Sequence, residues 1–222
     1  MVGPLRVGIV GGSIAGCSAA ILLQRAGHEV SVFERSKVGL VGRGGGIGTP
    51  TPVFEELVAS DIVDADMPRF TASSMPLLVR TNEHSRLGRQ PCALPLSFQA
   101  FHWTTLWNQL RRRVPDASYH RGHAVVSAET TASGEVSVEF ENGERASFDL
   151  LLFADGYRSI GRRLLLPNID LDYRGYMLWR GLLPESELAD TTPLEGTMPR
   201  LSYTNGAGNL VVYFIPGQDG SV

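Results

Sequence analysis

The fold class is decided by one stretch near the start of the chain, Leu5-Arg6-Val7-Gly8-Ile9-Val10-Gly11-Gly12-Ser13-Ile14-Ala15-Gly16. Its near-continuous apolar run predicts a strand that is buried on both faces of a parallel sheet. The glycines then predict a sharp turn into a helix that begins at Ala15 and ends at Gly27. The buried face of this helix is expected to hold its small and aliphatic residues at helical spacing, Ala15, Ala19, Leu22, Leu23 and Ala26.

A second apolar strand, Val30–Phe33, ends at Glu34 and completes the pattern of a dinucleotide-binding βαβ unit. In such a unit the pyrophosphate lies on free N–H groups at the helix start, and the carboxylate binds the ribose hydroxyls. Ser13 stands where the pattern usually has its second glycine, and its hydroxyl could donate a hydrogen bond in compensation. The open alternative is a structural strand–turn–helix of the kind found in any α/β protein.

The composition describes an ordinary soluble globular protein, with 43% hydrophobic and 19% charged residues. A net charge of −3 gives no reason to expect nucleic acid or an acidic membrane as a partner. No apolar run approaches the ~20 residues of a transmembrane helix, and the chain enters its first strand too early for a signal peptide. Cys17 and Cys92 indicate reduced thiols rather than a disulfide framework, so we expect a cytoplasmic protein.

Two clusters of charged or ligating side chains have ordinary structural explanations. The run Arg111–Arg113 lies near the end of a helix predicted at 101–114, where positive charge interacts favourably with the helix dipole. No cysteine or carboxylate cluster accompanies His120 and His123, so no metal site is predicted.

A glycine-rich loop follows the second strand. Lys37–Gly48 contains six glycines around Arg43. The loop is either a flexible connection or a segment shaped by close passage along a flat ligand. We favour the second interpretation, because a helix begins cleanly after the loop, at Thr51.

The middle and the end of the chain predict additional strands. Met75–Arg80 and Arg86–Leu96 are expected to form antiparallel strands in a second layer, away from the parallel sheet. Val125–Glu129 and Val136–Glu141 have the pattern of a β-hairpin. Later β-rich segments are expected at Tyr173–Leu183, Arg200–Thr204 and Leu210–Ile215.

The second informative stretch is Asp149–Gly156. Four large apolar residues at 150–153 predict a buried parallel strand, and Asp155-Gly156 follows at its carboxyl end, the edge at which open α/β sheets bind ligands. Ser159 can then cap a short helix that Pro167 stops. A plain turn before an ordinary helix is the open alternative.

Three motifs together resemble the single-component FAD-dependent aromatic hydroxylases of the p-hydroxybenzoate hydroxylase fold. The first is the Gly11–Gly16 turn with Glu34-Arg35 after the second strand. The second is Ala154–Arg162, which is similar to the Asp-Gly motif of the family, and the third is Gly175–Gly181, which is similar to the opening of its substrate-domain sheet.

Within that family the nearest likeness is to the dihydroxypyridine hydroxylases, through Gly44-Gly45-Gly46-Ile47 and Tyr213–Gly217. Many relatives carry an arginine where this chain has Trp103 and a glycine where it has Phe153. The third motif of the family, Gly-Asp leading a helix, occurs nowhere in the 222 residues. The chain therefore resembles the N-terminal part of such an enzyme, or a truncated relative.

The resemblance implies an α/β fold in which a Rossmann-like FAD-binding domain, residues 1–70 and 97–166, is interleaved with a partial β-rich substrate domain, residues 71–96 and 167–222. It implies an FAD-dependent monooxygenase that hydroxylates an electron-rich aromatic or heteroaromatic ring with NADH or NADPH and O2. A homodimer is left open. The alternatives are a truncated, non-catalytic flavoprotein fragment and, less favoured, an NAD-linked dehydrogenase.

The resemblance also implies site residues. Those expected to bind the cofactor lie on the two nucleotide motifs, the glycine loop and the FAD-domain helix: Gly11, Gly12, Ser13, Ile14, Ala15, Gly16, Glu34, Arg35, Arg43, Gly46, Ile47, Trp103, Asp155 and Gly156. Hydroxylation further needs a general base or an oriented water chain that helps a ring hydroxyl lose its proton. The candidates on the substrate side are His102, Tyr176 and Arg180, and each could equally be a packing or salt-bridge residue.

Overall fold

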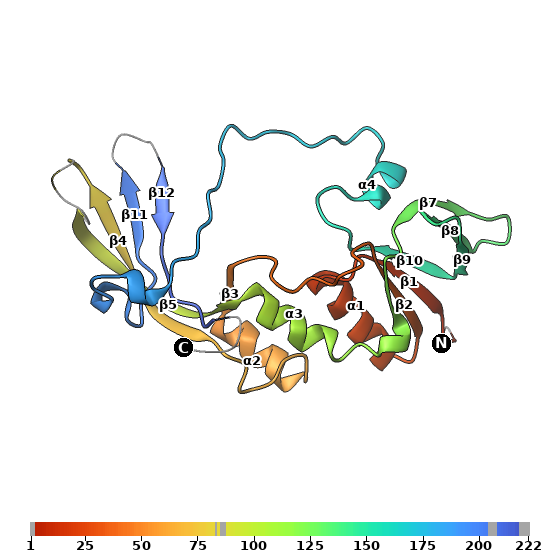
Figure 1. Ribbon diagram of the computed structural model, residues 1–222, viewed down its shortest axis with the longest axis horizontal. Helices are drawn as coiled ribbons and strands as arrows, with labels where there is room; N and C mark the ends of the chain where they lie inside the picture. The colour runs from red at the N-terminus through yellow and green to blue at the C-terminus, as the bar shows by residue number, and fades with distance from the viewer. Residues whose placement is uncertain (1–2, 83, 85–87, 204–207, 218–222) are drawn as a thin grey trace. The chain divides into compact units, whose positions relative to one another are not determined.

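The computed structural model describes residues 3–82, 84, 88–203 and 208–217, and it falls into two compact units (Figure 1). Unit 1 comprises Met1–Gly42 and Leu106–Leu178, and unit 2 comprises Arg43–Thr105 and Trp179–Val222. Each unit has its own sheet and its own buried side chains. The functional domains predicted from the sequence have other boundaries and stay a prediction.

Unit 1 is built on a four-stranded parallel sheet, called sheet A. Its strands lie in the order β10 (Leu150–Phe153), β1 (Arg6–Val10), β2 (Glu29–Glu34) and β6 (Tyr119–Arg121). Val7 and Ile9 of β1 are completely buried. The predictions that the opening stretch and the stretch before Asp155 form strands of one parallel sheet are therefore confirmed. The predicted burial of the second strand is wrong, because β10 is an edge strand of sheet A, with Leu150 39% exposed and the other three residues only half-buried.

Two layers cover the faces of sheet A. On one face, α1 (Ile14–Arg25) packs so closely that a Cβ built on Gly16 would lie 3.5 Å from the Ile9 side chain. On the other face, a Cβ on Gly8 would lie 2.8 Å from the Phe148 ring, so this glycine leaves room for a second sheet. That second sheet, sheet C, is the predicted hairpin with one further strand: β7 (Val125–Thr130), β8 (Val136–Phe140) and β9 (Arg145–Phe148).

An aromatic cluster joins sheets A and C. Phe33, Val138, Phe140 and Phe148 form its buried centre, and His120 stacks on Phe33 with ring centroids 5.1 Å apart. Burial lowers the pKa of His120, which is the behaviour of a packing residue. Within the described ranges, no group of three or more His, Cys, Asp or Glu side chains could hold a metal ion.

The prediction of which α1 residues are buried is wrong. The residues of this helix that are buried are Gly16, Cys17, Ala20 and Ile21, whereas Leu22 is 57% exposed. The helix is rotated because Gly16 lies against the carbonyl of Gly11, where a Cβ would come within 1.8 Å of the oxygen. The end of the helix near Gly27, which has a φ of 88°, is as predicted.

Short helices complete unit 1. η1 (Asp116–Ser118) precedes β6, and α4 (Ile160–Leu165) follows β10. The Ser159 hydroxyl accepts a hydrogen bond of 3.1 Å from the backbone N–H of Arg162, so the predicted cap is confirmed. No helix within the described residues is both long and apolar enough to cross a membrane.

Unit 2 is built on the five-stranded sheet B. Its strands lie in the order β12 (Asn209–Val211), β11 (Arg200–Tyr203), β4 (Phe70–Arg80), β5 (Arg89–His102) and β3 (Gly46–Pro50). The antiparallel pair β4–β5 confirms the predicted excursion into a second layer, although both strands are longer than expected. α2 (Thr51–Ala59) packs Phe54 on Phe101, and η2 (Glu185–Glu187) and η3 (Thr192–Leu194) precede β11.

Helix α3 (Trp103–Arg111) is shorter than the helix predicted at 101–114. Phe101 and His102 instead pair with Ile47 and Gly46 in the β5–β3 ladder. The strand thus continues two residues into the expected helix, because sheet hydrogen bonds satisfy the backbone there.

The strand predicted at Tyr173–Leu183 is not formed. These residues are neither helix nor strand, and Tyr176 and Trp179 are 75% and 86% exposed. A strand needs a neighbour to pair its N–H and C=O groups, and none of the strands described in the structure pairs with this segment. The β-propensity of its aromatic residues was therefore not enough to predict a strand.

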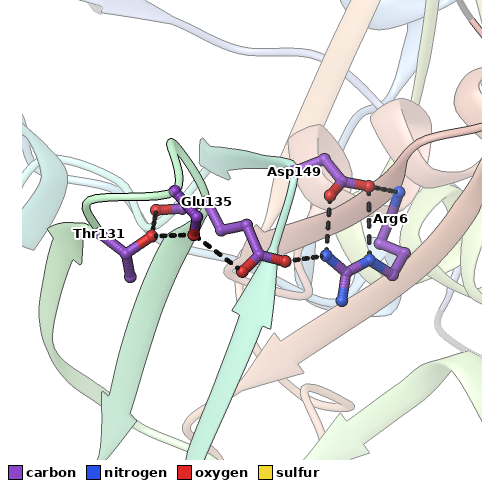
Figure 2. Close-up of polar contacts among 5 residues, drawn as sticks. Arg6, Thr131, Glu135 and Asp149 are labelled. Carbon is purple, nitrogen blue, oxygen red and sulfur yellow. Dashed lines mark hydrogen bonds and ion pairs between the residues drawn. The ribbon is translucent and has the colours of Figure 1, made fainter.

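An ion-pair network joins Arg6, at the amino end of β1, to Asp149, between β9 and β10, and to Glu135, just before β8 (Figure 2). The guanidinium of Arg6 donates to Asp149 at 2.8 Å and to Glu135 at 2.5 Å. The backbone N–H of Arg6 also donates to Asp149, at 2.7 Å, and Ser133 donates to Glu135. Hydrogen bonding to Arg6 lowers the pKa of the Asp149 carboxyl below its usual range.

Asp149→Asn is expected to lower the thermal stability at pH 7 and to lose this effect as the pH falls below about 4. The depressed folded-state pKa means that Asp149 stabilises the fold above its unfolded-state pKa, and that this contribution disappears as the carboxyl is protonated. Melting temperatures of both proteins between pH 3 and pH 7 check it, and 1 M salt should also narrow the difference. An equal difference at pH 3 and pH 7 would contradict the prediction.

Candidate dinucleotide-binding site

Three of the predicted groups meet at the carboxyl edge of sheet A in unit 1. The Gly11–Gly16 turn follows β1, Glu34 ends β2, and Asp155 follows β10. Because β1 pairs with β10 on one side and with β2 on the other, the strand order reverses at β1. Ligands of open α/β sheets bind at such a reversal.

Gly11 fits a place where no side chain could lie. Its φ is 103°, and its N–H donates to the carbonyl of Phe33 at 2.8 Å. A Cβ there would lie 2.4 Å from the carbonyl oxygen of Ala154. The turn is therefore wedged between the ends of β2 and β10, beside Asp155.

Ser13 occupies the N-cap position of α1. Its side chain makes no capping hydrogen bond, so the helix start is not closed by its own hydroxyl. The first N–H groups of a helix have no partner within the helix. The compensating role predicted for the Ser13 hydroxyl toward a phosphate stays a prediction.

Glu34 is buried, with 5% of its surface exposed. One carboxylate oxygen accepts the N–H of Gly12 at 3.0 Å, and the other accepts the N–H of Ser36 at 2.8 Å. A carboxylate offers about four acceptor positions, so these two bonds leave capacity for ribose hydroxyls. The sequence placed Glu34 at the strand end but did not indicate that it also holds the turn.

Asp155 has one oxygen in use and one without a partner. Its Oδ2 accepts the N–H of Ile160 at 2.7 Å, whereas Oδ1 is buried and has no hydrogen-bond partner among the described residues. Buried polar atoms without a partner are uncommon, and this oxygen has the capacity to accept a hydrogen bond from a bound ligand or water. Gly156 follows with a φ of 81° and nothing within 4 Å of where its Cβ would lie.

The carbonyl of Gly12 collects three donors that sequence reasoning missed. They are the Tyr119 hydroxyl at 2.8 Å, the indole N–H of Trp107 at 3.0 Å and the Cys17 thiol at 3.3 Å. A Cβ on Gly12 would lie 2.2 Å from the Tyr119 hydroxyl. Only the glycine itself is a sequence signal here, since Trp107 and Tyr119 are distant in the chain.

Unit 2 brings a different set of predicted residues together around Gly44–Gly46. The backbone N–H of Trp103 donates to Gly45 at 2.9 Å, and a Cβ on Gly44 would lie 2.7 Å from the Trp103 side chain. A Cβ on Gly45 would lie 3.1 Å from Arg180, and one on Gly46 would lie 2.8 Å from the Tyr213 hydroxyl. In the sequence, Tyr213 belongs to the segment Tyr213–Gly217 that resembles the family, and nothing there indicated that it would lie next to these glycines.

His102 is buried at the end of β5, with 2% of its surface exposed. Its Nδ1 accepts the backbone N–H of Thr104 at 3.1 Å. Burial lowers its pKa, so the ring is neutral near pH 7 and carries its proton on Nε2. Such a ring presents a donor at Nε2 rather than a base, and the catalytic role of His102 stays a prediction.

The other predicted residues are placed as follows. Tyr176 belongs to unit 1, whereas His102 and Arg180 belong to unit 2. Arg35 is exposed, and Ile47 is half-buried in β3. The carbonyl of Arg43 accepts a hydrogen bond of 3.2 Å from Thr104, and its role in cofactor binding stays a prediction.

A parallel sheet whose edge carries a glycine turn and a buried carboxylate defines a Rossmann-like nucleotide-binding unit. The family model of the NAD(P)-binding Rossmann-like domain matches residues 9–46, which contain the last two residues of β1, all of α1 and all of β2 with Glu34. This match covers most of the βαβ unit and extends to the first residue of β3.

Similarities to known proteins that extend over most of the chain indicate the class of protein. The chain is 30% identical over 217 residues to 2,6-dihydroxypyridine 3-monooxygenase of Paenarthrobacter nicotinovorans, covering 96% of this chain and 52% of that one. The structure of 2,6-dihydroxypyridine-3-hydroxylase from Arthrobacter nicotinovorans superposes with a TM-score of 0.86 at 28% identity, over 99% of this chain and 54% of that one. FAD-dependent urate hydroxylase of Klebsiella oxytoca is 30% identical over 200 residues, which cover 81% of this chain and 48% of that one.

The resemblance inferred from the motifs is therefore confirmed: over nearly its whole length the chain is similar to the N-terminal half of 2,6-dihydroxypyridine 3-monooxygenase. The chain spans about half the length of the curated relatives it matches, between 48% and 52% in the two described above. The predicted α/β fold, a Rossmann-like parallel sheet with an additional β-rich part, is confirmed as well.

Glu34→Ala is expected to lower the free energy of unfolding by about 3 kcal/mol or more, because two backbone N–H groups each lose a charged acceptor. Glu34→Gln should cost less, since the amide oxygen can still accept one of them. Urea unfolding of the ligand-free chain measures both. Glu29→Ala, at the exposed first position of the same strand, is the control and should change stability little; a Glu34→Ala variant as stable as this control would contradict the prediction.

Proposed function

We propose that this chain is the N-terminal part of an FAD-dependent monooxygenase, which hydroxylates an electron-rich aromatic or heteroaromatic ring with NADH or NADPH and O2. The observation that carries the proposal is the unpartnered, buried Oδ1 of Asp155 beside the Gly11 turn. The similarity to 2,6-dihydroxypyridine 3-monooxygenase along the chain supports the aromatic substrate class.

The residues of unit 1 fit the dinucleotide part of FAD. The Glu34 carboxylate would accept the adenosine ribose hydroxyls with its remaining lone pairs. The N–H groups from Ser13 to Gly16 would receive the pyrophosphate, where the positive end of the helix dipole favours negative charge. Asp155 would accept from hydroxyl groups of the ribityl part, which would satisfy its free oxygen.

FAD, once bound, supplies the oxygen-activating redox chemistry, and the chain supplies orientation and exclusion of water. On the substrate side, Arg180 could hold an anionic ring oxygen, since its guanidinium is charged at every physiological pH. The Nε2–H of His102 could donate to such an oxygen. Tyr176 would contribute only if its exposed segment folds over the substrate, so it is the weakest of the three candidates.

A second candidate function is a flavin-binding chain without hydroxylase activity. The observation that favours it is that the 222 residues contain no Gly-Asp pair, the motif expected to contact the flavin ribityl and phosphate. An NAD-linked dehydrogenase would use the same βαβ unit, but it would not need an Asp-Gly motif after β10. We also propose a cytoplasmic location, in keeping with the unpaired Cys17 and Cys92.

Asp155→Asn is expected to slow flavin reduction by NAD(P)H about tenfold, which corresponds to about 1.4 kcal/mol, while leaving the melting temperature of the ligand-free chain nearly unchanged. The asparagine oxygen can still accept the Ile160 N–H, whereas the charge at the unpartnered position is lost. Anaerobic stopped-flow absorbance and thermal unfolding measure the two effects. Asp170→Asn, on the exposed segment after α4, is the control; a large loss of stability with normal reduction would favour a purely structural Asp155.

The 222-residue chain alone is expected to bind FAD weakly and to hydroxylate little, whereas a chain extended by a segment with the Gly-Asp motif should do both. Without that segment the flavin is free to move, and a displacement of ~1 Å can cost about a hundredfold in rate. Reduced flavin open to water should then yield hydrogen peroxide instead of hydroxylated product.

The measurement follows NAD(P)H oxidation, hydrogen peroxide and hydroxylated product together for the short and the extended chain, with 2,6-dihydroxypyridine as the first substrate. Tight FAD binding and coupled hydroxylation by the short chain would contradict the prediction. Absence of FAD from both chains would overturn the proposed function itself.

A further inference from the structure

We propose that Tyr119 and Trp107 are positioning residues that aim the N–H of Ser13 at the nucleotide pyrophosphate by holding the carbonyl of Gly12. The inference rests on the proposed function, because it assumes that the turn binds a dinucleotide. It concerns two side chains that belong to neither nucleotide motif and that lie behind the turn rather than at its surface.

The carbonyl of Gly12 is held by three buried donors. Tyr119 donates from β6 at 2.8 Å, Trp107 from α3 at 3.0 Å and Cys17 from α1 at 3.3 Å. The exposed fractions of Tyr119 and Trp107 are both 6%, and that of Cys17 is 0%. A carbonyl oxygen has two lone pairs, so this one is saturated and its direction is fixed by three separate elements.

The direction of this carbonyl also fixes the next N–H. Gly12 C=O and Ser13 N–H belong to one planar trans peptide, in which the two bonds point in opposite directions. With the oxygen drawn toward the buried donors, the Ser13 N–H points away from them. The turn itself follows β1 at the carboxyl edge of sheet A, where ligands of open α/β sheets bind. Ser13 is also the N-cap residue of α1, at the end where the helix dipole attracts anions.

The donors are themselves held in place and protonated. The guanidinium of Arg111 lies over the Tyr119 ring, 4.0 Å from its centroid, and bonds the carbonyl of Val114 at 2.7 Å. Burial raises the pKa of the Tyr119 phenol, and it raises the pKa of the Cys17 thiol to about 12. Both groups therefore remain donors at every pH at which the protein would work.

Strand β2, the neighbour of β6, holds the N–H of Gly12. Glu34 accepts from Gly12 at 3.0 Å, so the residue is fixed through both its N–H and its C=O. The two contacts should have different effects on a nucleotide. Glu34 is also expected to bind the ribose, whereas the buried Tyr119 and Trp107 would act only through the direction of one peptide.

The test compares ADP with adenosine, because only ADP carries the pyrophosphate. In the full chain, Tyr119→Phe and Trp107→Phe should each weaken ADP binding about threefold and the double variant about tenfold, which corresponds to about 1.4 kcal/mol. Adenosine binding should change by less than about twofold, because the ribose contact is untouched. Calorimetric titration of both ligands measures the ratio of the two affinities.

Val138→Ala is the matched control, since it removes buried volume from the core beneath sheet C without contacting the turn. It should lower stability in urea as much as the single variants or more, and should leave the ADP-to-adenosine ratio unchanged. ADP binding of normal strength in the double variant, or equal losses for ADP and adenosine, would overturn the positioning role. A wild-type chain that binds neither ADP nor FAD would overturn the proposed function, and the inference with it.

Discussion

The carboxylate of Glu34 lies at the end of β2 with 5% of its surface exposed, and it accepts the N–H groups of Gly12 and Ser36. A buried charge is tolerated only when it is well hydrogen-bonded, and each such bond contributes about 1.5–3 kcal/mol. This interaction joins the end of one parallel strand to the turn that follows its neighbour. The path of the chain from β1 into α1 depends on it, and so does every group expected to meet the pyrophosphate.

The same turn is fixed from its other side by packing that only glycine permits. Gly11 passes within van der Waals reach of Ala154, and Gly16 lies against the carbonyl of Gly11. A site held in this way loses little conformational freedom when a ligand arrives, which is the physical advantage of preorganisation. In the proposed site, the direction of the Ser13 N–H is set by the groups that hold Gly12 and not by the Ser13 side chain.

Local patterns predicted the βαβ unit, the strand before Asp155, the hairpin of sheet C and the cap at Ser159, because each is encoded within a few residues. Local patterns could not predict contacts between segments that are distant in the sequence. Trp107 and Tyr119, which bond the carbonyl of Gly12, are 95 and 107 residues away from it in the chain. The prediction of which α1 residues are buried was wrong for a different reason: the close contact of Gly16 with the carbonyl of Gly11 outweighs the helical spacing of the larger residues. The strand predicted at Tyr173–Leu183 was wrong, because a strand forms only beside another strand that pairs with it, and β-propensity says nothing of that partner.

The glycine loop shows how one composition can support two physical interpretations. Flexibility and a shaped loop both predict many glycines in Lys37–Gly48. In unit 2, Gly44 and Gly46 each lie where a Cβ would collide with the side chain of Trp103 or Tyr213. These glycines are therefore required by close packing against the protein itself, and Gly45 is fixed further by the hydrogen bond from Trp103. The side chains of Trp103, Arg180 and Tyr213 thus lie one after another along a single short backbone segment of unit 2, and a larger residue at Gly44 or Gly46 would displace one of them.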